Sequence, residues 1–299
     1  MTAPGGRRRR LASFVGVTLA LAIGCRAAPS AESTARSTAT VAPLPSAGCR
    51  AGATLPALAG AARDLVVDGT TRHYLLDAAA GTADVPKPVV LVFHGFRHSA
   101  AGIRTGVGFA ERAAAGELIA VHADGRDDVH LLNTVGRGWD IAPEEGRDTA
   151  FVAALLDALE QERCVDRRRI YATGFSNGAF FSNLLACRLA DRIAAVAAVA
   201  GARPLDGCSS TTPVPILFFH GRADPIVPPR LTAGAAAWWR RVNHCVEPET
   251  DDGDARDGCT AARGCAADVV VCRGPQQHAW PEGASDRIWD FFEAHPRRD

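Results

Sequence analysis

The amino-acid sequence predicts an α/β fold built on a doubly wound, mostly parallel β-sheet with an antiparallel hairpin near its N-terminus. Two observations support this prediction. Short segments that are apolar at every position are typical of parallel strands covered on both faces. They alternate with segments of helical apolar spacing, which indicates crossover helices between the strands. The expected strands are Val89–Phe93, Leu118–Val121, Ala194–Ala200 and Ile216–Phe219, with weaker candidates at Ile170–Ala172 and Val269–Cys272.

Two helices and one hairpin can be placed from local patterns. Thr149–Gln161 carries its apolar residues on one helical face, and a second helix is expected from Gly178 to Leu189. Leu65–Val67 and His73–Leu76 lie on either side of Asp68-Gly69, a dipeptide that favours a tight hairpin turn.

Composition excludes several classes of protein. The chain has 299 residues, 47% of them hydrophobic, which is enough to bury a full core and argues against a fibrous or disordered protein. Its 33 basic residues are balanced by 33 acidic ones, so there is no basic excess to attract a phosphate backbone. Nucleic acid is therefore not expected as a partner.

The N-terminus predicts export. Arg7–Arg10 precede the apolar run Leu11–Ile23, which is too short to span a membrane but suits a signal peptide over residues 1–24. Ala22-Ile23-Gly24-Cys25 resembles the lipobox of bacterial lipoproteins, and Cys25 would then carry the lipid; a plain secretory signal is the alternative. The membrane is expected as a partner only through this anchor. Residues 1–24 hold four arginines and no acid, so their removal leaves a net charge of −4.

Two further segments follow the signal peptide. Residues 25–48 are rich in Ala, Ser, Thr and Pro, and a segment with so few large apolar side chains is expected to be a flexible linker. Residues 49–299 contain no repeat and no second break in composition, and we expect them to form a single domain.

One motif indicates nucleophilic catalysis. Gly174-Phe175-Ser176-Asn177-Gly178 is a G-x-S-x-G sequence between an expected strand and an expected helix. In this context a tight turn holds the serine hydroxyl outside the sheet, and the small residues let strand and helix approach. Ser176 is therefore the candidate nucleophile.

A serine nucleophile needs a base, and the base needs a carboxylate to orient it. Asp224 follows the expected strand Ile216–Phe219, and His278 follows the last strand candidate. The chain order of Ser176, Asp224 and His278 is the order of an α/β-hydrolase. We therefore expect these three residues to form the catalytic triad on an α/β-hydrolase fold.

The oxyanion of the reaction needs two backbone N–H donors. One is expected from Asn177, which follows the nucleophile, and the other from Phe96, in the loop after Val89–Phe93. His94 precedes that loop and is expected to steady it rather than to act as a base.

These residues belong to a wider set of motifs that resembles the secreted polyhydroxybutyrate depolymerase and feruloyl esterase group of α/β-hydrolases. The resemblance covers the chain from about Cys49 to Phe292 and implies a carboxylic ester as substrate, with Ser176, Asp224 and His278 as the triad. This chain has Gln276-Gln277 where the group usually has glycines, and Phe96-Arg97 where it has smaller residues. The matching segments are Leu91-Val92-Phe93-His94-Gly95, Cys164-Val165-Asp166, Gly174-Phe175-Ser176-Asn177-Gly178, Ala186-Cys187, Phe219-His220-Gly221, Ala223-Asp224-Pro225-Ile226-Val227-Pro228, Asn243–Cys245 and His278-Ala279-Trp280-Pro281.

The expected reaction is two-step acyl transfer to water through an acyl-enzyme, and it needs no cofactor. No metal site is expected, because the sequence contains no C-x-x-C pair and no H-E-x-x-H. Trp139 and Trp280 are candidates for an aromatic wall of the substrate pocket, with ordinary packing as the alternative.

Several functions remain open beside a polyhydroxybutyrate depolymerase-like ester hydrolase. The enzyme could be a feruloyl or acetyl-xylan type esterase, or the same fold could transfer acyl groups or cleave peptides. A non-catalytic lipoprotein that binds a partner and keeps the triad as a relic is the alternative from another class. Labelling by a serine-directed reagent separates the enzymes from the last alternative.

The nine cysteines also carry a prediction. If Cys25 carries lipid or leaves with the signal peptide, the remaining eight can all form disulfides. Fold topology favours Cys187 with Cys208, and Cys245 with one of the three cysteines at 259, 265 and 272.

Overall fold

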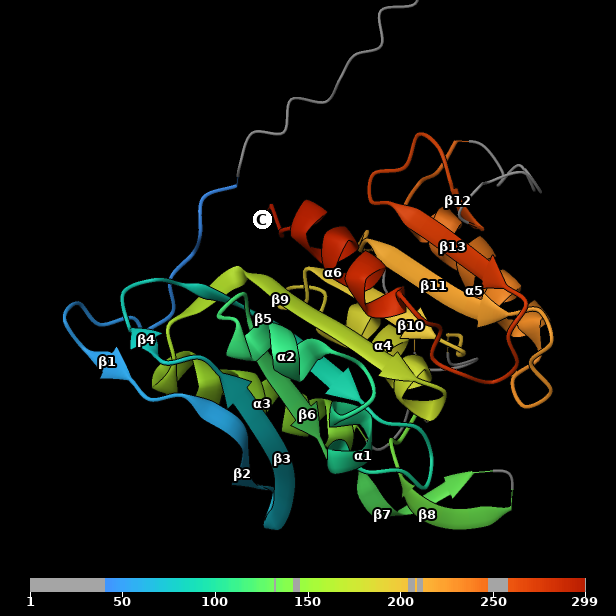
Figure 1. Cartoon of the computed structure of the whole chain (residues 1–299). Helices are drawn as coiled ribbons and strands as arrows, with labels where there is room; N and C mark the ends of the chain where they lie inside the picture. The colour runs from blue at the N-terminus through green and yellow to red at the C-terminus, as the bar shows by residue number, and fades with distance from the viewer. Residues whose placement is uncertain are drawn as a thin grey trace, which may run out of the picture. The chain divides into compact units, whose positions relative to one another are not determined.

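A nine-stranded sheet forms the centre of the fold, in the order β12-β13-β11-β10-β9-β5-β6-β3-β2 (Figure 1). The strands from β6 to β13 in this order are parallel, whereas β2, β3 and β12 pair antiparallel at the edges. The predicted doubly wound, mostly parallel sheet with an N-terminal hairpin is confirmed. The strands are β2 (Leu58–Val67), β3 (Thr70–Ala78), β5 (Lys87–Phe93), β6 (Ile119–Ala123), β9 (Val165–Phe175), β10 (Ala195–Val199), β11 (Ile216–Gly221), β12 (Cys259–Ala261) and β13 (Val269–Gly274).

This computed structural model describes residues 41–131, 133–141, 146–203, 208, 212–246 and 258–298. The expected signal peptide over residues 1–24, the lipidation site Cys25 and the linker up to residue 40 lie outside the described residues. Within the described ranges, no helix is both long enough and apolar enough to cross a membrane.

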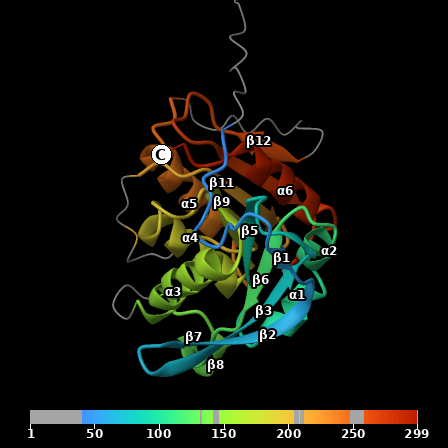
Figure 2. The same cartoon turned by 90° about the vertical axis from the view of Figure 1, so that its left-hand side faces the viewer.

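Helices cover both faces of the sheet (Figure 2). One core contains apolar residues of α3, α4 and α5, and the other contains residues of α1, α2 and α6. The predicted strands are apolar at every position because each faces both of these layers. The helices are α1 (Ala100–Arg104), α2 (Phe109–Ala114), α3 (Arg147–Glu162), α4 (Asn177–Arg188), α5 (Pro229–Val242) and α6 (Ala284–Ala294).

The predicted hairpin is β2 and β3, and both strands are longer than the sequence pattern suggested. Val67 pairs with Thr70 across Asp68 and Gly69, whose φ angles are 49° and 73°. Two consecutive positive φ angles are the geometry that an Asp-Gly turn favours. Two small two-stranded sheets lie outside the main one: β1 (Thr54–Leu55) with β4 (Gly81–Thr82), and β7 (Arg126–Leu131) with β8 (Thr134–Gly138).

The folded unit begins at Val41, earlier than the expected boundary at Cys49. The Leu44 N–H donates to Asp166 Oδ1 at 2.9 Å. Ser46 is buried; its hydroxyl donates to the Arg163 carbonyl at 2.9 Å and accepts the Val165 N–H at 3.0 Å. Residues 41–48 are therefore held at the beginning of β9 by hydrogen bonds. The linker prediction extended to residue 48 because it considered only large apolar side chains, and this segment is attached without them.

Four disulfides use all eight cysteines after Cys25. Cys187 bonds to Cys208 and Cys245 bonds to Cys265, as the topology favoured. The other two bridges, Cys49–Cys164 and Cys259–Cys272, were not predicted individually.

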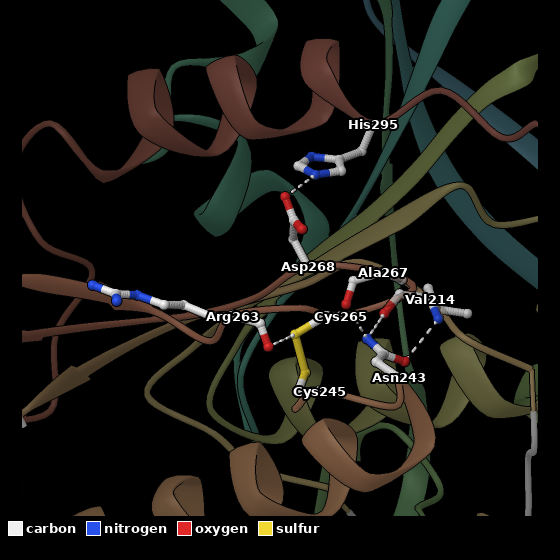
Figure 3. Close-up of a disulfide and its surroundings, with 8 residues drawn as sticks. All are labelled: Val214, Asn243, Cys245, Arg263, Cys265, Ala267, Asp268 and His295. Carbon is white, nitrogen blue, oxygen red and sulfur yellow. Dashed lines mark hydrogen bonds and ion pairs between the residues drawn. A yellow bond between two sulfur atoms is a disulfide. The ribbon is translucent and has the colours of Figure 1, made fainter. Parts of the chain in front are cut away.

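The Cys245–Cys265 bridge lies beside a buried amide that joins three segments (Figure 3). Asn243 accepts the Val214 N–H through Oδ1 and donates through Nδ2 to the carbonyls of Val214 and Ala267. This region connects α5 to the strands β11 and β13 that precede the candidate acid and base.

Candidate active site

The candidate nucleophile lies in a sharp turn between β9 and α4. Ser176 has φ 54° and ψ −119°, a backbone conformation that an L-residue rarely adopts. The turn needs glycine on both sides, because a Cβ at Gly174 would lie 2.4 Å from the Gly178 carbonyl oxygen and a Cβ at Gly178 would lie 2.2 Å from the Phe93 carbonyl oxygen. The G-x-S-x-G sequence therefore has the strand-turn-helix context in which such a serine hydroxyl is exposed at the end of a sheet.

The candidate acid and base meet at the same edge of the sheet. Asp224 follows β11 and His278 follows β13, and these two parallel strands are neighbours. The distance from His278 Nδ1 to Asp224 Oδ2 is 2.8 Å. A carboxylate accepts hydrogen bonds, so Nδ1 carries the proton and the other ring nitrogen keeps a lone pair to act as a base.

The Asp224 carboxylate is held in its charged form although its side chain is fully buried. Burial alone would raise its pKa, but hydrogen bonds from His278 and from the Val227 and Ile226 amides lower the pKa below the ordinary aspartate value. Both amides donate to Oδ1 at 2.9 Å. The acid is therefore fixed in position and remains charged at neutral pH.

The candidate base lies next to the turn that carries Ser176. The His278 ring contacts the ring of Phe175, the residue before Ser176, with 4.8 Å between the centroids. Within the described part of the chain, no hydrogen bond joins the Ser176 hydroxyl to His278. The structure thus brings Asp224 and His278 together directly, and it brings His278 to the turn that carries Ser176.

The expected oxyanion donors flank the same turn. A Cβ placed on Gly95 would lie 3.4 Å from the Ser176 Cβ, so the loop after β5 runs directly beside the nucleophile. Asn177 is the first residue of α4, where backbone N–H groups have no partner within the helix. Neither the Phe96 nor the Asn177 N–H donates to another described residue. Two free donors therefore lie on the two segments from which they were expected.

Both the sequence and the fold resemble those of known proteins. The family described as Phospholipase/Carboxylesterase matches residues 147–259. A probable feruloyl esterase C of Aspergillus flavus is 30% identical over 194 residues, which cover 62% of this chain and 67% of that protein. The chain belongs to the feruloyl esterase-like group of the α/β-hydrolases. Feruloyl esterase B of Piromyces equi is 33% identical over 238 residues, 71% of this chain and 43% of that protein. The chain spans only about half the length of the first curated relatives it matches.

Solved structures agree on the α/β-hydrolase fold. An acetyl xylan esterase from Aspergillus awamori has a TM-score of 0.61 at 15% identity, covering 79% of this chain and all of that one. A carboxylesterase of Bacillus cereus has a TM-score of 0.54 at 15% identity, covering 74% and 93%. At these identities the likeness concerns the fold alone. The predicted α/β-hydrolase fold is confirmed.

The two tryptophans proposed for the pocket wall have different surroundings in this feruloyl esterase-like chain. Trp139 is completely buried and packs between Phe93 and Phe181, so its expected role as a pocket wall is wrong and the packing alternative holds. Its position in a short loop after polar residues concealed this burial. Trp280 is half-buried and donates through Nε1 to the Ser285 hydroxyl at 3.0 Å.

The sequence did not predict the hairpin β7–β8, which lies against the loop after β5. The Arg97 N–H donates to the Arg137 carbonyl at 2.7 Å, and a Cβ on Gly138 would lie 2.9 Å from the Phe96 ring. The strands contain several charged residues, so they show no apolar alternation that could have revealed them. A cavity of about 800 Å³, lined mostly by polar and charged residues, lies between this hairpin, the β2–β3 turn and the end of β6.

No metal centre is found in the described ranges, where no three His, Cys, Asp or Glu residues are grouped to hold an ion.

Proposed function

We propose that this protein hydrolyses carboxylic esters through a triad of Ser176, His278 and Asp224. The observation that carries the proposal is the 2.8 Å contact of His278 Nδ1 with the buried, charged Asp224, beside a serine held at φ 54°. Membership of the feruloyl esterase-like group supports the same reaction.

The steps follow from the protonation states. His278 Nε2 accepts the proton of Ser176 as the hydroxyl oxygen bonds to the ester carbonyl carbon. The Phe96 and Asn177 N–H groups stabilise the oxyanion, and the bond to the alcohol breaks as His278 returns the proton to the alcohol oxygen. Water then attacks the acyl-enzyme, with His278 again accepting a proton, and this step releases the acid and restores Ser176.

A fluorophosphonate probe tests the nucleophile. The purified protein is expected to be labelled, Ser176→Ala to lose labelling, and Ser46→Ala to keep it, because Ser46 is hydrogen-bonded at the beginning of β9, at the other end of the strand that leads to Ser176. Absence of labelling in the folded protein contradicts the enzyme proposal and favours a non-catalytic binding protein. Cleavage of a peptide panel without cleavage of esters contradicts ester hydrolysis.

The substrate class is a finer proposal. Relatives named feruloyl esterase and acetylxylan esterase favour esters of that type for this chain. Hydroxybutyrate oligomers are the second candidate, supported by the resemblance in the motifs around Ser176 and His278. Initial rates on feruloyl esters, acetylated xylan oligomers and hydroxybutyrate trimers, measured side by side, decide between them.

We also propose that the protein is exported and anchored through a lipid on Cys25, followed by a short tether to the body at Val41. The four disulfides support an oxidising compartment. The intact mass of the protein made from the full chain tests this proposal: a diacylglycerol-bearing Cys25 as the first residue is expected. A water-soluble product without lipid contradicts the anchor and supports a plain secretory signal.

A further inference from the structure

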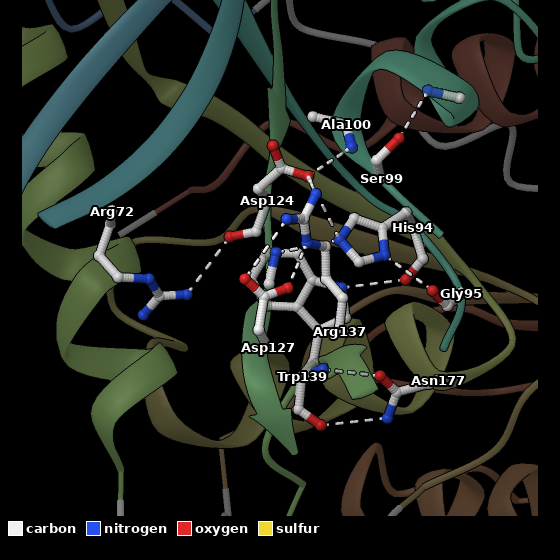
Figure 4. A network of polar contacts seen from close by, with 12 residues as sticks. Arg72, His94, Gly95, Ser99, Ala100, Asp124, Asp127, Arg137, Trp139 and Asn177 are labelled. Atoms are coloured by element: carbon white, nitrogen blue, oxygen red, sulfur yellow. Dashed lines mark hydrogen bonds and ion pairs between the residues drawn. The ribbon is translucent and has the colours of Figure 1, made fainter. Parts of the chain in front are cut away.

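The two proposed oxyanion donors belong to segments that are far apart in the sequence, and their spacing must be set by contacts between those segments. Phe96 lies in the loop after β5 and Asn177 begins α4. A chain of hydrogen bonds through the buried side chains of His94, Trp139 and Asn177 joins the two segments (Figure 4). We call these three side chains the oxyanion clamp.

The first part of the clamp is the Asn177 side chain, which is 2% exposed. Its Oδ1 accepts the Trp139 N–H at 2.7 Å, and its Nδ2 donates to the Trp139 carbonyl at 3.1 Å. Both polar groups of the amide are thus paired with the backbone of one residue. This pairing fixes the first turn of α4, and with it the direction of the Asn177 N–H.

The second part is the Trp139 side chain. Its Nε1–H donates to the His94 carbonyl at 2.9 Å, which joins the β8 end to the loop after β5. The indole stacks on Phe181 and meets the edge of Phe93, each with 4.9 Å between ring centroids. Because the ring is enclosed on these sides, the donor has little freedom to move.

The third part is the His94 imidazole, which is completely buried. Its Nε2 accepts the Gly125 N–H at 2.9 Å, so Nδ1 carries the proton and donates to the Gly95 carbonyl at 2.7 Å. Burial lowers the pKa of His94, which keeps the ring neutral and this tautomer in place. The His98 N–H adds a second bond to the same carbonyl at 3.1 Å.

The Gly95 carbonyl and the Phe96 N–H belong to the same peptide unit. The described chain has no cis peptide bond, and in a planar trans peptide the C=O and N–H groups point in opposite directions. Holding the Gly95 carbonyl against His94 therefore turns the Phe96 N–H to the opposite side of that unit. The contact controls the direction of the donor without touching the substrate.

We propose that His94, Trp139 and Asn177 are positioning residues that fix the two oxyanion donors, and that the bond from His94 Nδ1–H to the Gly95 carbonyl sets the direction of the Phe96 N–H. This inference rests on the proposed ester hydrolysis. His94 then contributes to transition-state stabilisation indirectly, by orienting the peptide unit between Gly95 and Phe96.

Two substitutions separate the two hydrogen bonds of the ring. The amide of His94→Asn can reach the place of Nδ1 and donate to the Gly95 carbonyl, whereas the longer side chain of His94→Gln can reach the place of Nε2 and pair only with Gly125. We expect His94→Gln to lose roughly 10²- to 10³-fold in kcat, the size of losing one oxyanion donor, with KM nearly unchanged. The loss in kcat for His94→Asn should be smaller, about tenfold or less on the same scale.

The measurement is kcat and KM on a nitrophenyl ester, with the folded fraction of each variant determined by circular dichroism and thermal unfolding. His244→Asn is the matched control, because its side chain is exposed and it follows α5, outside the clamp, at a φ of 54° that asparagine tolerates. Its kcat should equal that of the unmodified protein.

The outcomes distinguish the inference from the function on which it rests. A folded His94→Gln with the kcat of the unmodified protein overturns the clamp alone. Equal losses in both variants that follow the folded fraction also overturn it, because they indicate a purely structural histidine. An unmodified protein that cleaves no ester removes the proposed function and the clamp together.

Discussion

Gly178 lies directly against the carbonyl oxygen of Phe93: a Cβ atom added to this glycine would lie 2.2 Å from that oxygen. The contact brings α4 onto the end of β5, and it is made by backbone atoms that cannot move aside without distorting the sheet. Gly178, two residues after the proposed nucleophile, thus sets the distance between the two segments that carry the proposed oxyanion donors.

Replacing this glycine should therefore damage both the fold and the site. We expect Gly178→Ala to lower the free energy of unfolding by about 1–3 kcal/mol and to reduce kcat by more than tenfold, because overpacking must displace α4 or β5. Urea unfolding and ester hydrolysis measure the two effects. Gly234→Ala is the control: it lies in α5 with no atom near its Cβ position, and it should stabilise the protein by about 0.5–1 kcal/mol. Equal changes in stability for Gly178→Ala and Gly234→Ala contradict the prediction that the close contact at Gly178 is responsible.

The Asp224 carboxylate should matter for rate far more than for substrate binding. In Asp224→Asn the side chain can offer an amide N–H to the imidazole, which favours the wrong tautomer of His278. We expect kcat to fall by about 10⁴-fold at neutral pH with KM little changed. Asp191→Asn, at an exposed position, should behave as the unmodified protein. A loss below tenfold in Asp224→Asn excludes this aspartate as the triad acid.

The disulfides should differ in their contribution to stability according to the length of chain they close. Cys49–Cys164 closes 115 residues and Cys259–Cys272 closes 13. Loop-closure entropy gives about 5 kcal/mol for the first and about 3 kcal/mol for the second. Paired substitutions to Ala, compared by guanidinium unfolding, should therefore destabilise more at Cys49 and Cys164. The reverse order means that native packing around the short bridge outweighs chain entropy.

Acid should destabilise the fold well above the range in which carboxylates titrate. Burial lowers the pKa values of His94, His122 and His220 below the ordinary 6.5, so below this pH the unfolded chain binds more protons than the folded one. The free energy of unfolding is therefore not reduced by these histidines above pH 6.5. Below pH 6.5 it falls as the pH decreases towards their pKa values in the folded protein.

Urea unfolding at several values between pH 8 and pH 5 measures this loss. Each buried histidine contributes a slope of at most about 1.4 kcal/mol per pH unit, so His122→Gln should flatten the profile by one such share. His122 is the suitable site because it lies on β6 and is itself neither a proposed triad residue nor a member of the clamp. A profile that stays level down to pH 5 contradicts the prediction.

The sequence predicted the parts of the fold that depend on local pattern. Central strands such as Val89–Phe93 are buried on both faces, and burial of this kind leaves an unmistakable run of apolar residues. The turn at Ser176 also follows from a local motif at a strand end, and so does the proposed order of the three candidate triad residues.

What the sequence could not show depends on contacts between distant segments. Trp139 is recognised as a core residue only when Phe181, 42 positions further along the chain, is seen to stack on it. Ser46 is buried and its hydroxyl is held by hydrogen bonds to residues more than 100 positions away, and a composition argument does not detect such burial. The β7–β8 hairpin is held by pairing and ion pairs in a segment without apolar alternation.

The attachment of residues 41–49 has a consequence for access to substrate. This segment meets the body at the beginning of β9, where Pro45 pairs with Asp166 and Cys49 is bonded to Cys164. The proposed catalytic residues lie beyond the opposite ends of the parallel strands. A force applied at the N-terminal end of this segment is therefore borne by a covalent bridge at the amino-terminal edge of the sheet. The edge that carries the proposed catalytic residues lies opposite this point of attachment, where a large substrate can reach it.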